Sequence, residues 1–263
     1  MDEFRTLTAN IEKLLHIQCG NYKEDYIKRR LASRMNAVNI KEYGAYNRFM
    51  LANTEEQEKL RNALTINVTK FFRDPEVFET IKRDLIPQIL KNKQRVRIWS
   101  AGCSSGEEPY TLAIILYELS LTNPGMDGIV YASDIDYEIL KRAKEGVYEK
   151  NTLENMNEAQ IRKHFTQRPD GKYEVKPHIK EKVRFQHHDL MRGEPISRYL
   201  DIITCRNVTI YFNEKQKNDL CTEFYNGLNP GGFYVMGLSE YLGKGLEHLF
   251  KPYKPLLKIF TRQ

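Results

Sequence analysis

Two adjacent carboxylates, Glu107 and Glu108, open a predicted helix directly after a small glycine-containing loop at residues 100–106. Glycine lets a backbone approach a ligand closely and a helix N-terminus offers unpaired N–H groups, so this pattern is typical of a nucleotide site. The loop lacks both the Gly-x-Gly-x-x-Gly pattern and the Gly-Lys-Ser/Thr of phosphate-binding loops. Because two carboxylates would repel a pyrophosphate, we expect a ligand with positive charge, such as an amine or a sulfonium. The alternative is that the glutamates only complement the helix dipole.

A second acidic position follows the next predicted strand along the chain. Asp134 lies just beyond the β-rich run at 128–132. In doubly wound sheets an acid at this position commonly binds the two hydroxyls of a ribose. Capping of the next helix is the alternative for an aspartate, but Asp136 is better placed for that role. The two acidic positions together predict a nucleoside-containing cofactor.

Two further polar clusters are candidates for the same site. Residues 67–75 interleave polar and aromatic side chains, although Phe71 and Phe72 could equally form a core between two domains. Residues 205–212 follow a predicted strand at the position where open α/β sheets bind ligands. A buried Arg206 would require a carboxylate partner there.

The elements that must position these residues differ between the two parts of the chain. Before residue 70, apolar residues recur at three- and four-residue steps, which predicts a small helical domain. The expected helices are 4–15, 22–38, 43–51 and 55–64. After residue 95, short β-rich runs alternate with helical segments, which predicts a mostly parallel sheet covered on both faces. The expected strands are 96–99, 128–132, 183–185, 200–205, 232–236 and 256–260, the last two as a candidate antiparallel pair.

One segment departs from this alternation. Residues 164–176 predict a β-hairpin, because Asp170 and Gly171 form a strong turn signal beside a short β-rich run. We interpret the hairpin as a small insertion attached to the sheet.

Composition limits the class of protein further. The 263 residues are 41% hydrophobic, enough for a buried core. The longest nearly apolar run, 112–119, is far shorter than the roughly 20 residues of a membrane span, and we see no signal peptide, so we expect a cytoplasmic protein. The net charge of +6 suits an acidic partner but not a dedicated nucleic-acid binder. Four irregularly spaced cysteines without a Cys-x-x-Cys pair argue against a metal site.

Four motifs follow one another along the chain. They are Asn-x-Thr-x-Phe-Phe-Arg from residue 67, Gly-Cys-Ser-x-Gly-Glu-Glu-Pro-Tyr from 102, Ser-Asp-Ile-Asp from 133 and Cys-Arg-Asn-Val-x-Ile-Tyr-Phe from 205. With them the chain resembles the chemotaxis receptor methyltransferases, the CheR family, from end to end. The resemblance implies that S-adenosylmethionine (AdoMet) methylates glutamate side chains of bacterial chemoreceptors for chemotactic adaptation. The products would be glutamyl methyl esters and S-adenosylhomocysteine, and no metal is expected.

The resemblance also implies a fold. It is an α/β architecture with a doubly wound, mostly parallel, seven-stranded AdoMet-dependent methyltransferase sheet at residues 75–263. A small all-α N-terminal domain, residues 1–74, precedes this sheet. A small β-hairpin insertion is expected at 164–180.

The family's site residues carry over onto this sequence as implications of the resemblance. The cofactor contacts match Asn67, Thr69, Arg73, Glu107, Asp134, Asp189, Leu190, Arg206 and Asn207. Tyr211, with Arg73, matches residues beside the transferring methyl group. Glu107 suits the ammonium of the cofactor's methionine portion, and an arginine suits its carboxylate. Since an acceptor glutamate is already ionised at pH 7, we expect Arg73 and Tyr211 to orient it without a general base.

Receptor recognition is predicted at two places. The segment 22–38 carries five basic residues against two acidic ones. Within it Arg30 and Arg34, four residues apart, would guide a glutamate-rich receptor helix, with a merely solvated face as the alternative. Family members that use a receptor tether grip it by strand addition at the hairpin. Here the turn at 168–172 is short and Pro169 removes a backbone donor, so we expect binding to the receptor's helical bundle without a C-terminal pentapeptide tether.

Three other functions fit part of these observations. A methyltransferase acting on RNA or a small molecule would share the cofactor pocket but should show base-stacking aromatic residues and a stronger basic face. A non-catalytic AdoMet-binding, receptor-docking module would not need Asn67, Arg73 and Tyr211, which are all present. An NAD-dependent oxidoreductase is disfavoured by Glu107 and by the missing glycine pattern.

Overall fold

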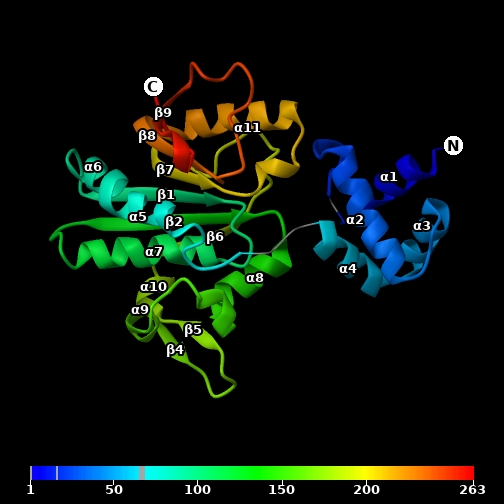
Figure 1. Ribbon diagram of the computed structural model, residues 1–263, viewed down its shortest axis with the longest axis horizontal. Coiled ribbons are helices and arrows are strands. Elements are labelled where there is room, and N and C mark those ends of the chain that lie inside the picture. The colour runs from blue at the N-terminus through cyan, green and yellow to red at the C-terminus, as the bar shows by residue number, and fades with distance from the viewer. Residues whose placement is uncertain (1, 16, 65–68) are drawn as a thin grey trace. The chain divides into compact units, whose positions relative to one another are not determined.

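The computed structural model describes residues 2–15, 17–64 and 69–263, and the chain forms two compact units (Figure 1). The helical unit consists of Met1–Val68 together with Tyr211–Gln216, and the sheet unit of Thr69–Ile210 together with Lys217–Gln263. Each unit has its own core of buried apolar side chains.

The helical unit contains the four predicted helices. They are α1 (Glu3–Leu15), α2 (Glu24–Ala37), α3 (Tyr43–Ala52) and α4 (Thr54–Leu64). Each helix buries residues three or four positions apart, such as Leu7 and Ile11 of α1 or Ile27 and Leu31 of α2. The apolar spacing therefore correctly predicted the four helices, although Leu14, which the spacing places on the buried face of α1, is 37% exposed. The segment before α2 differs from the prediction, because a 3-10 turn (Cys19–Asn21) precedes the helix.

Residues 211–216 complete the helical unit, although they follow the fourth parallel strand of the sheet in sequence. Phe212 forms an isolated antiparallel bridge with Tyr22, and the two ring centroids lie 5.6 Å apart. The Lys23 backbone N–H donates to the Tyr211 carbonyl oxygen over 3.0 Å, and the Asn213 N–H donates to the Asn21 carbonyl oxygen over 3.2 Å. The helical unit is thus built from two separate stretches of the chain.

The sheet unit is built on seven strands in the order β6-β2-β1-β7-β8-β10-β9. The strands are β1 (Arg95–Ala101), β2 (Asp127–Asp134), β6 (Val183–His187), β7 (Leu200–Cys205), β8 (Leu228–Met236), β9 (Phe250–Lys254) and β10 (Ile259–Arg262). All neighbours from β6 to β8 pair in parallel, whereas β10 pairs antiparallel with both β8 and β9. The predicted mostly parallel, seven-stranded sheet is confirmed.

The periodicity argument missed strand β9 and the helical segment 75–90 of the sheet unit. Strand β9 lies at the sheet edge, and its lysines and proline hide the apolar alternation that marks a strand. Residues 75–90 form a broken helix, with α5 (Pro75–Thr80), a π-helical turn (Ile81–Leu85) and α6 (Ile86–Leu90). The expected strand at 256–260 starts only at Ile259, after a 3-10 turn.

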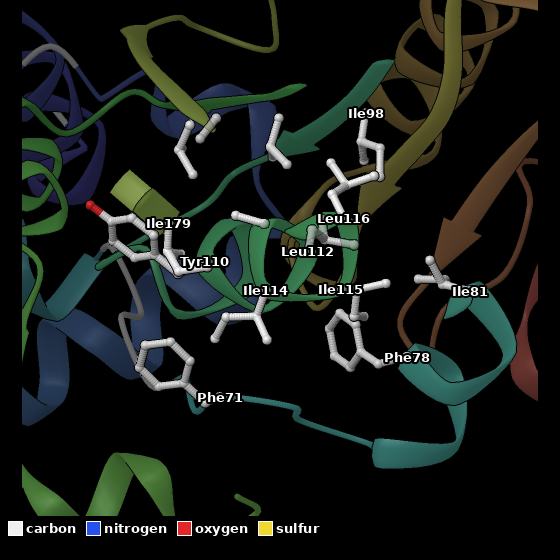
Figure 2. Close-up of a cluster of buried hydrophobic side chains, with 14 of the residues drawn as sticks. Phe71, Phe78, Ile81, Ile98, Tyr110, Leu112, Ile114, Ile115, Leu116 and Ile179 are labelled. Atoms are coloured by element: carbon white, nitrogen blue, oxygen red, sulfur yellow. The ribbon is translucent and has the colours of Figure 1, made fainter. Parts of the chain in front are cut away.

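Helices cover both faces of the sheet, as a doubly wound fold requires (Figure 1). On one face α7 (Glu107–Ser120) packs Leu112 and Leu116 near Ile98 of β1, as Figure 2 shows. On the other face α11 (Glu214–Gly227) packs Phe224 against Trp99, with ring centroids 5.2 Å apart. Helix α8 (Tyr137–Glu145) follows β2 and completes the βα alternation.

A small antiparallel sheet, ordered β3-β5-β4, contains the predicted hairpin. Strands β4 (Phe165–Gln167) and β5 (Tyr173–Val175) form the hairpin, and β3 (Val147–Tyr148) adds a strand that the sequence did not reveal. The Arg168 N–H donates to the Lys172 carbonyl oxygen over 2.8 Å, which closes the turn, and Gly171 has a φ of 83°. Helices α9 (Glu158–His164) and α10 (Pro177–Lys180) flank this small sheet. No helix in the described parts of the chain is long and apolar enough to span a membrane.

Candidate functional site

The glycine loop after β1 is held in place by the ends of the neighbouring strands. The backbone N–H groups of Gly102 and Cys103 donate to the Ser133 carbonyl oxygen of β2 over 2.9 and 2.8 Å. A Cβ at Gly102 would lie 2.7 Å from a methyl of Val208, which follows β7, and Gly102 also has a φ of 73°. Glycine is therefore required here for both conformation and space. The contacts bring the ends of β1, β2 and β7 together at one edge of the sheet.

Asp134 faces this loop, as a ribose-binding acid should. Its carboxylate accepts hydrogen bonds from the backbone N–H of Ser104 over 2.8 Å and of Asp136 over 3.1 Å. Burial raises the pKa of Asp134 above its ordinary value. The Asp136 carboxylate caps α8 by accepting from the N–H groups of Glu138 and Ile139. The prediction that Asp136 is the cap is confirmed.

Glu107 is a buried acid without a cationic partner. Its side chain is only 3% exposed, and Ser105 Oγ donates to its Oε2 over 2.7 Å. Burial raises the pKa of Glu107 to about 7. Within the described parts of the chain no lysine or arginine forms an ion pair with it. A buried carboxylate of this kind favours a positively charged ligand group, because such a group would remove the cost of its isolation.

Glu108 has a different role from its neighbour. It accepts hydrogen bonds from Ser100 Oγ of β1 over 2.8 Å and from Thr204 Oγ1 of β7 over 2.6 Å. Its other oxygen lies 3.3 Å from Arg206 Nη1. Glu108 thus joins α7 to the two central strands. This structural role differs from both alternatives that the sequence offered, namely a ligand contact and a carboxylate that complements the helix dipole.

Arg206 is buried and pairs with carboxylates, as the sequence predicted. Besides Glu108, its Nη2 donates to Asp74 Oδ2 over 2.5 Å and to the Arg73 carbonyl oxygen over 2.9 Å. Its guanidinium also lies 5.0 Å from the centre of the Phe78 ring. These bonds fix the turn before α5, where Asp74 has a φ of 57° and its side chain does not cap the helix. Arg206 therefore holds the Arg73 backbone at this edge. Both terminal nitrogens of Arg206 already bond to groups of the protein.

Four other predicted cofactor residues, Asp189, Leu190, Asn207 and Thr69, lie in the described part of the sheet unit. The His188 N–H donates to the Asp134 carbonyl oxygen over 3.0 Å, which places the following Asp189 and Leu190 beside Asp134. Asn207 follows Arg206 with a φ of 61°, and its Oδ1 is buried without any donor among the described residues. Thr69 is half-buried in the sheet unit, whereas Asn67 lies outside the described residues.

The two predicted catalytic residues belong to different units. Arg73 is part of the sheet unit. Tyr211 is part of the helical unit, where its ring centroid lies 4.6 Å from that of Tyr26 in α2.

The predicted receptor-binding pair on α2 does not act as a pair. Arg34 donates from Nε and Nη2 to both oxygens of Glu56, over 3.0 and 2.6 Å. Glu56 is 3% exposed and also accepts from Tyr46 Oη over 2.6 Å. Arg34 therefore neutralises a buried carboxylate of α4 and supports the helical unit, so its assignment to receptor guidance is corrected. Arg30 lies over the Tyr26 ring, 5.4 Å from its centre.

Two models of known protein domains match this chain. The model of the domain described as "CheR methyltransferase, SAM binding domain" matches residues 67–255, and that of "CheR methyltransferase, all-alpha domain" matches residues 2–65. The chain belongs to the CheR methyltransferase family. This CheR-family chain therefore carries a domain that binds AdoMet, and the unpaired Glu107 carboxylate and the Asn207 Oδ1 without a donor both fit that ligand.

Curated relatives cover most of this CheR-family chain. Chemotaxis protein methyltransferase 2 of Vibrio cholerae is 33% identical over 85% of this chain and 80% of its own length. Chemotaxis protein methyltransferase 1 of Pseudomonas aeruginosa is 32% identical over 94% of this chain and 92% of its own. The chemotaxis protein methyltransferase of Listeria innocua is 32% identical over 91% of this chain and 90% of its own. The chain is thus an AdoMet-dependent methyltransferase of chemotaxis.

Proposed function

We propose that this chain transfers the methyl group of AdoMet to glutamate side chains of chemoreceptors, which yields glutamyl methyl esters and S-adenosylhomocysteine. The observation that carries the proposal is Glu107, at the start of the helix that follows the glycine loop. It is a buried acid with a pKa of about 7 and has no cationic partner among the described residues. It supports a ligand with an amino-acid ammonium group, as AdoMet has. Membership in a family of chemotaxis methyltransferases supports receptors as the methyl acceptors.

The proposed binding roles follow from where each side chain lies. Glu107 holds the ammonium of the methionine portion, and Asp134 holds the ribose hydroxyls. Asp189 and Leu190, beside Asp134, flank the adenine. The other proposed cofactor contacts are Asn67, Thr69, Arg73, Arg206 and Asn207. Among these, Arg206 acts through Arg73.

The proposed reaction requires no proton transfer by the protein. AdoMet supplies an electrophilic methyl group on a sulfonium, and a glutamate carboxylate with a reference pKa of about 4.3 is already ionised to accept it. Arg73 and Tyr211 orient the acceptor carboxylate, and catalysis rests on this alignment and on the exclusion of water. Alignment of this kind can lower a barrier by roughly 7–11 kcal/mol in favourable cases.

We expect the protein to transfer label from methyl-labelled AdoMet to receptor-containing membranes, in a form that alkali releases as methanol. Alkali-labile label identifies a carboxyl methyl ester and separates it from methylated RNA or amine. Tyr211→Phe and Arg73→Ala are expected to reduce turnover or receptor affinity. Alkali-stable label, or label only in RNA or small molecules, would contradict the proposed acceptor, and full activity of both variants would contradict the catalytic assignment.

Arg30 is the α2 residue that we propose for receptor guidance, now without Arg34. Arg30→Glu should slow receptor methylation steeply at low salt and less at high salt, because ions in solution screen the attraction between Arg30 and an approaching acidic helix. Its affinity for S-adenosylhomocysteine should not change. Lys59→Glu, on the exposed side of α4, is the matched charge reversal and should leave the rate unaltered. Equal rates for Arg30→Glu and wild type in both salts would disprove the role.

We also propose that the receptor is bound through its helical bundle without a C-terminal tether. The hairpin turn closes over only five residues, and its ion pairs from Arg168 to Asp170 and Glu174 stay within the hairpin. Calorimetric titration with a receptor C-terminal pentapeptide should therefore show no measurable binding at micromolar concentrations. Tight, saturable binding would show that this short hairpin still accepts a strand.

A further inference from the structure

Glu240 is a buried carboxylate with an unusual set of donors. It follows β8, is 2% exposed, and accepts from four consecutive backbone N–H groups. Those donors are the N–H groups of Asn207 (2.9 Å), Val208 (3.0 Å), Thr209 (2.7 Å) and Ile210 (3.2 Å). Thr209 Oγ1 donates over 2.8 Å and the Gly237 N–H over 2.6 Å. The charge of Glu240 is thus compensated by hydrogen bonds from the loop that follows β7.

This arrangement determines the backbone of the loop. Successive N–H groups that converge on one anion form a concave site, and the anion holds the loop in the only conformation that presents all of them. Asn207 has a φ of 61°, which a non-glycine residue adopts only where its surroundings impose it. The carboxylate of Glu240 is the group that imposes it.

Gly237 shows how closely the two loops fit. A Cβ at this position would lie 2.6 Å from Glu240 Oε2 and 2.8 Å from the Asn207 nitrogen. Any other residue would separate the carboxylate from its donors. The side-chain oxygen of Asn207, Oδ1, is buried without a donor in the described parts of the chain. The Asn207 side chain, whose Oδ1 has no donor among the described residues, is therefore attached to the backbone that Glu240 holds in place.

We propose that Glu240 is a positioning residue that orients Asn207 toward AdoMet. The inference rests on the proposed cofactor contact of Asn207. Glu240 itself touches the loop and not the ligand. Its removal should weaken cofactor binding in protein that is still folded, which a purely structural role would not do.

The test compares Glu240→Gln with Asp201→Asn. Asp201 is also 2% exposed and accepts from the Arg97 N–H over 2.8 Å and from Asn229 Nδ2 over 2.7 Å, but it lies at the opposite end of β7. Both variants lose one buried negative charge, so both should unfold at a lower temperature. Only Glu240→Gln should raise the dissociation constant for S-adenosylhomocysteine, by at least tenfold in calorimetry and with unchanged stoichiometry.

Two further variants make the result decisive. Thr209→Val removes one donor to Glu240 and should raise the dissociation constant in the same direction by a few fold, even if Glu240→Gln yields little folded protein. Asn207→Ala should raise it as much as Glu240→Gln. Affinity of Glu240→Gln and Thr209→Val within twofold of wild type would overturn the inference. If Asn207→Ala alone is weakened, the proposed cofactor contact stands without Glu240, and if Asn207→Ala binds normally, both fail.

Discussion

Glu107→Gln should bind S-adenosylhomocysteine about a hundredfold more weakly than the wild-type chain, roughly 2.7 kcal/mol, because the charge that holds the ligand ammonium is removed. The same substitution should raise the unfolding temperature of the ligand-free protein. Burial raises the pKa of Glu107 from an ordinary value of 4.5 to about 7, so the folded state binds this proton more tightly than the unfolded state. Stability therefore falls as pH rises from about 4.5 to about 7, and glutamine removes that loss.

Calorimetry checks the binding half of this prediction, and scanning calorimetry checks the stability half. Wild-type affinity should weaken as pH falls below 7, because the ligand ammonium requires the ionised Glu107, and Glu107→Gln should lack that dependence. The gain in unfolding temperature should be largest above pH 7 and vanish near pH 4.5. Equal affinities, or a lower unfolding temperature for the variant at pH 8, would contradict the assignment.

Glu118, at the other end of α7, provides a matched control. Hydrogen bonding with His164 and Lys82 lowers its pKa to about 2, so its charge stabilises the fold above its ordinary titration range. Glu118→Gln should therefore lower the unfolding temperature at pH 7 and leave cofactor affinity unchanged. The two substitutions on one helix thus have effects of opposite sign on stability.

Arg206→Leu should destabilise the sheet unit by about 3–5 kcal/mol, because it leaves the Asp74 and Glu108 carboxylates near one another without their shared cation. Urea unfolding followed by Trp99 fluorescence reports on this unit, since Trp99 is the only tryptophan of the chain and is fully buried in the sheet. The midpoint should fall markedly with little change in slope.

A compensating variant separates charge from packing at the same place. Arg206→Leu combined with Asp74→Asn and Glu108→Gln removes the whole buried ion network and should recover much of the lost stability. A midpoint for Arg206→Leu within experimental error of wild type would show that the network contributes nothing. Failure of the triple variant to recover would assign the loss to packing against Phe78.

The sequence predicted the parts of the fold whose signal is local. The helices of the N-terminal unit, the parallel strands and the Asp170-Gly171 turn all have periodicity or turn residues within a few positions. Strand β9 has no such signal, because an edge strand with lysines and proline buries little on either face. The helical segment 75–90 was missed, although Pro87, which lacks a backbone N–H, follows the π-helical turn at Ile81–Leu85 and is a local signal for an irregular helix.

The sequence predicted the surroundings of residues whose contacts lie within their own motif. It did not predict the surroundings of residues whose partners are distant in the sequence. The unpaired Glu107 and the cap at Asp136 follow from position in a strand–loop–helix unit. Arg34 seemed available for a receptor because its partner Glu56 lies on another helix, 22 positions away. Glu240 lies 33 positions from Asn207, and a single glutamate after a strand gives no sign of the loop that it holds.

The return of residues 211–216 to the helical unit has a consequence for engineering. This unit is not a detachable N-terminal module, since Phe212 packs on Tyr22 and two backbone hydrogen bonds join the distant stretches. A chimaera that exchanges only the first 68 residues with a relative would combine one protein's helices with another's Tyr211–Gln216 segment. Transplanting receptor preference between relatives therefore requires a two-piece graft with three junctions, each at a boundary with the sheet unit.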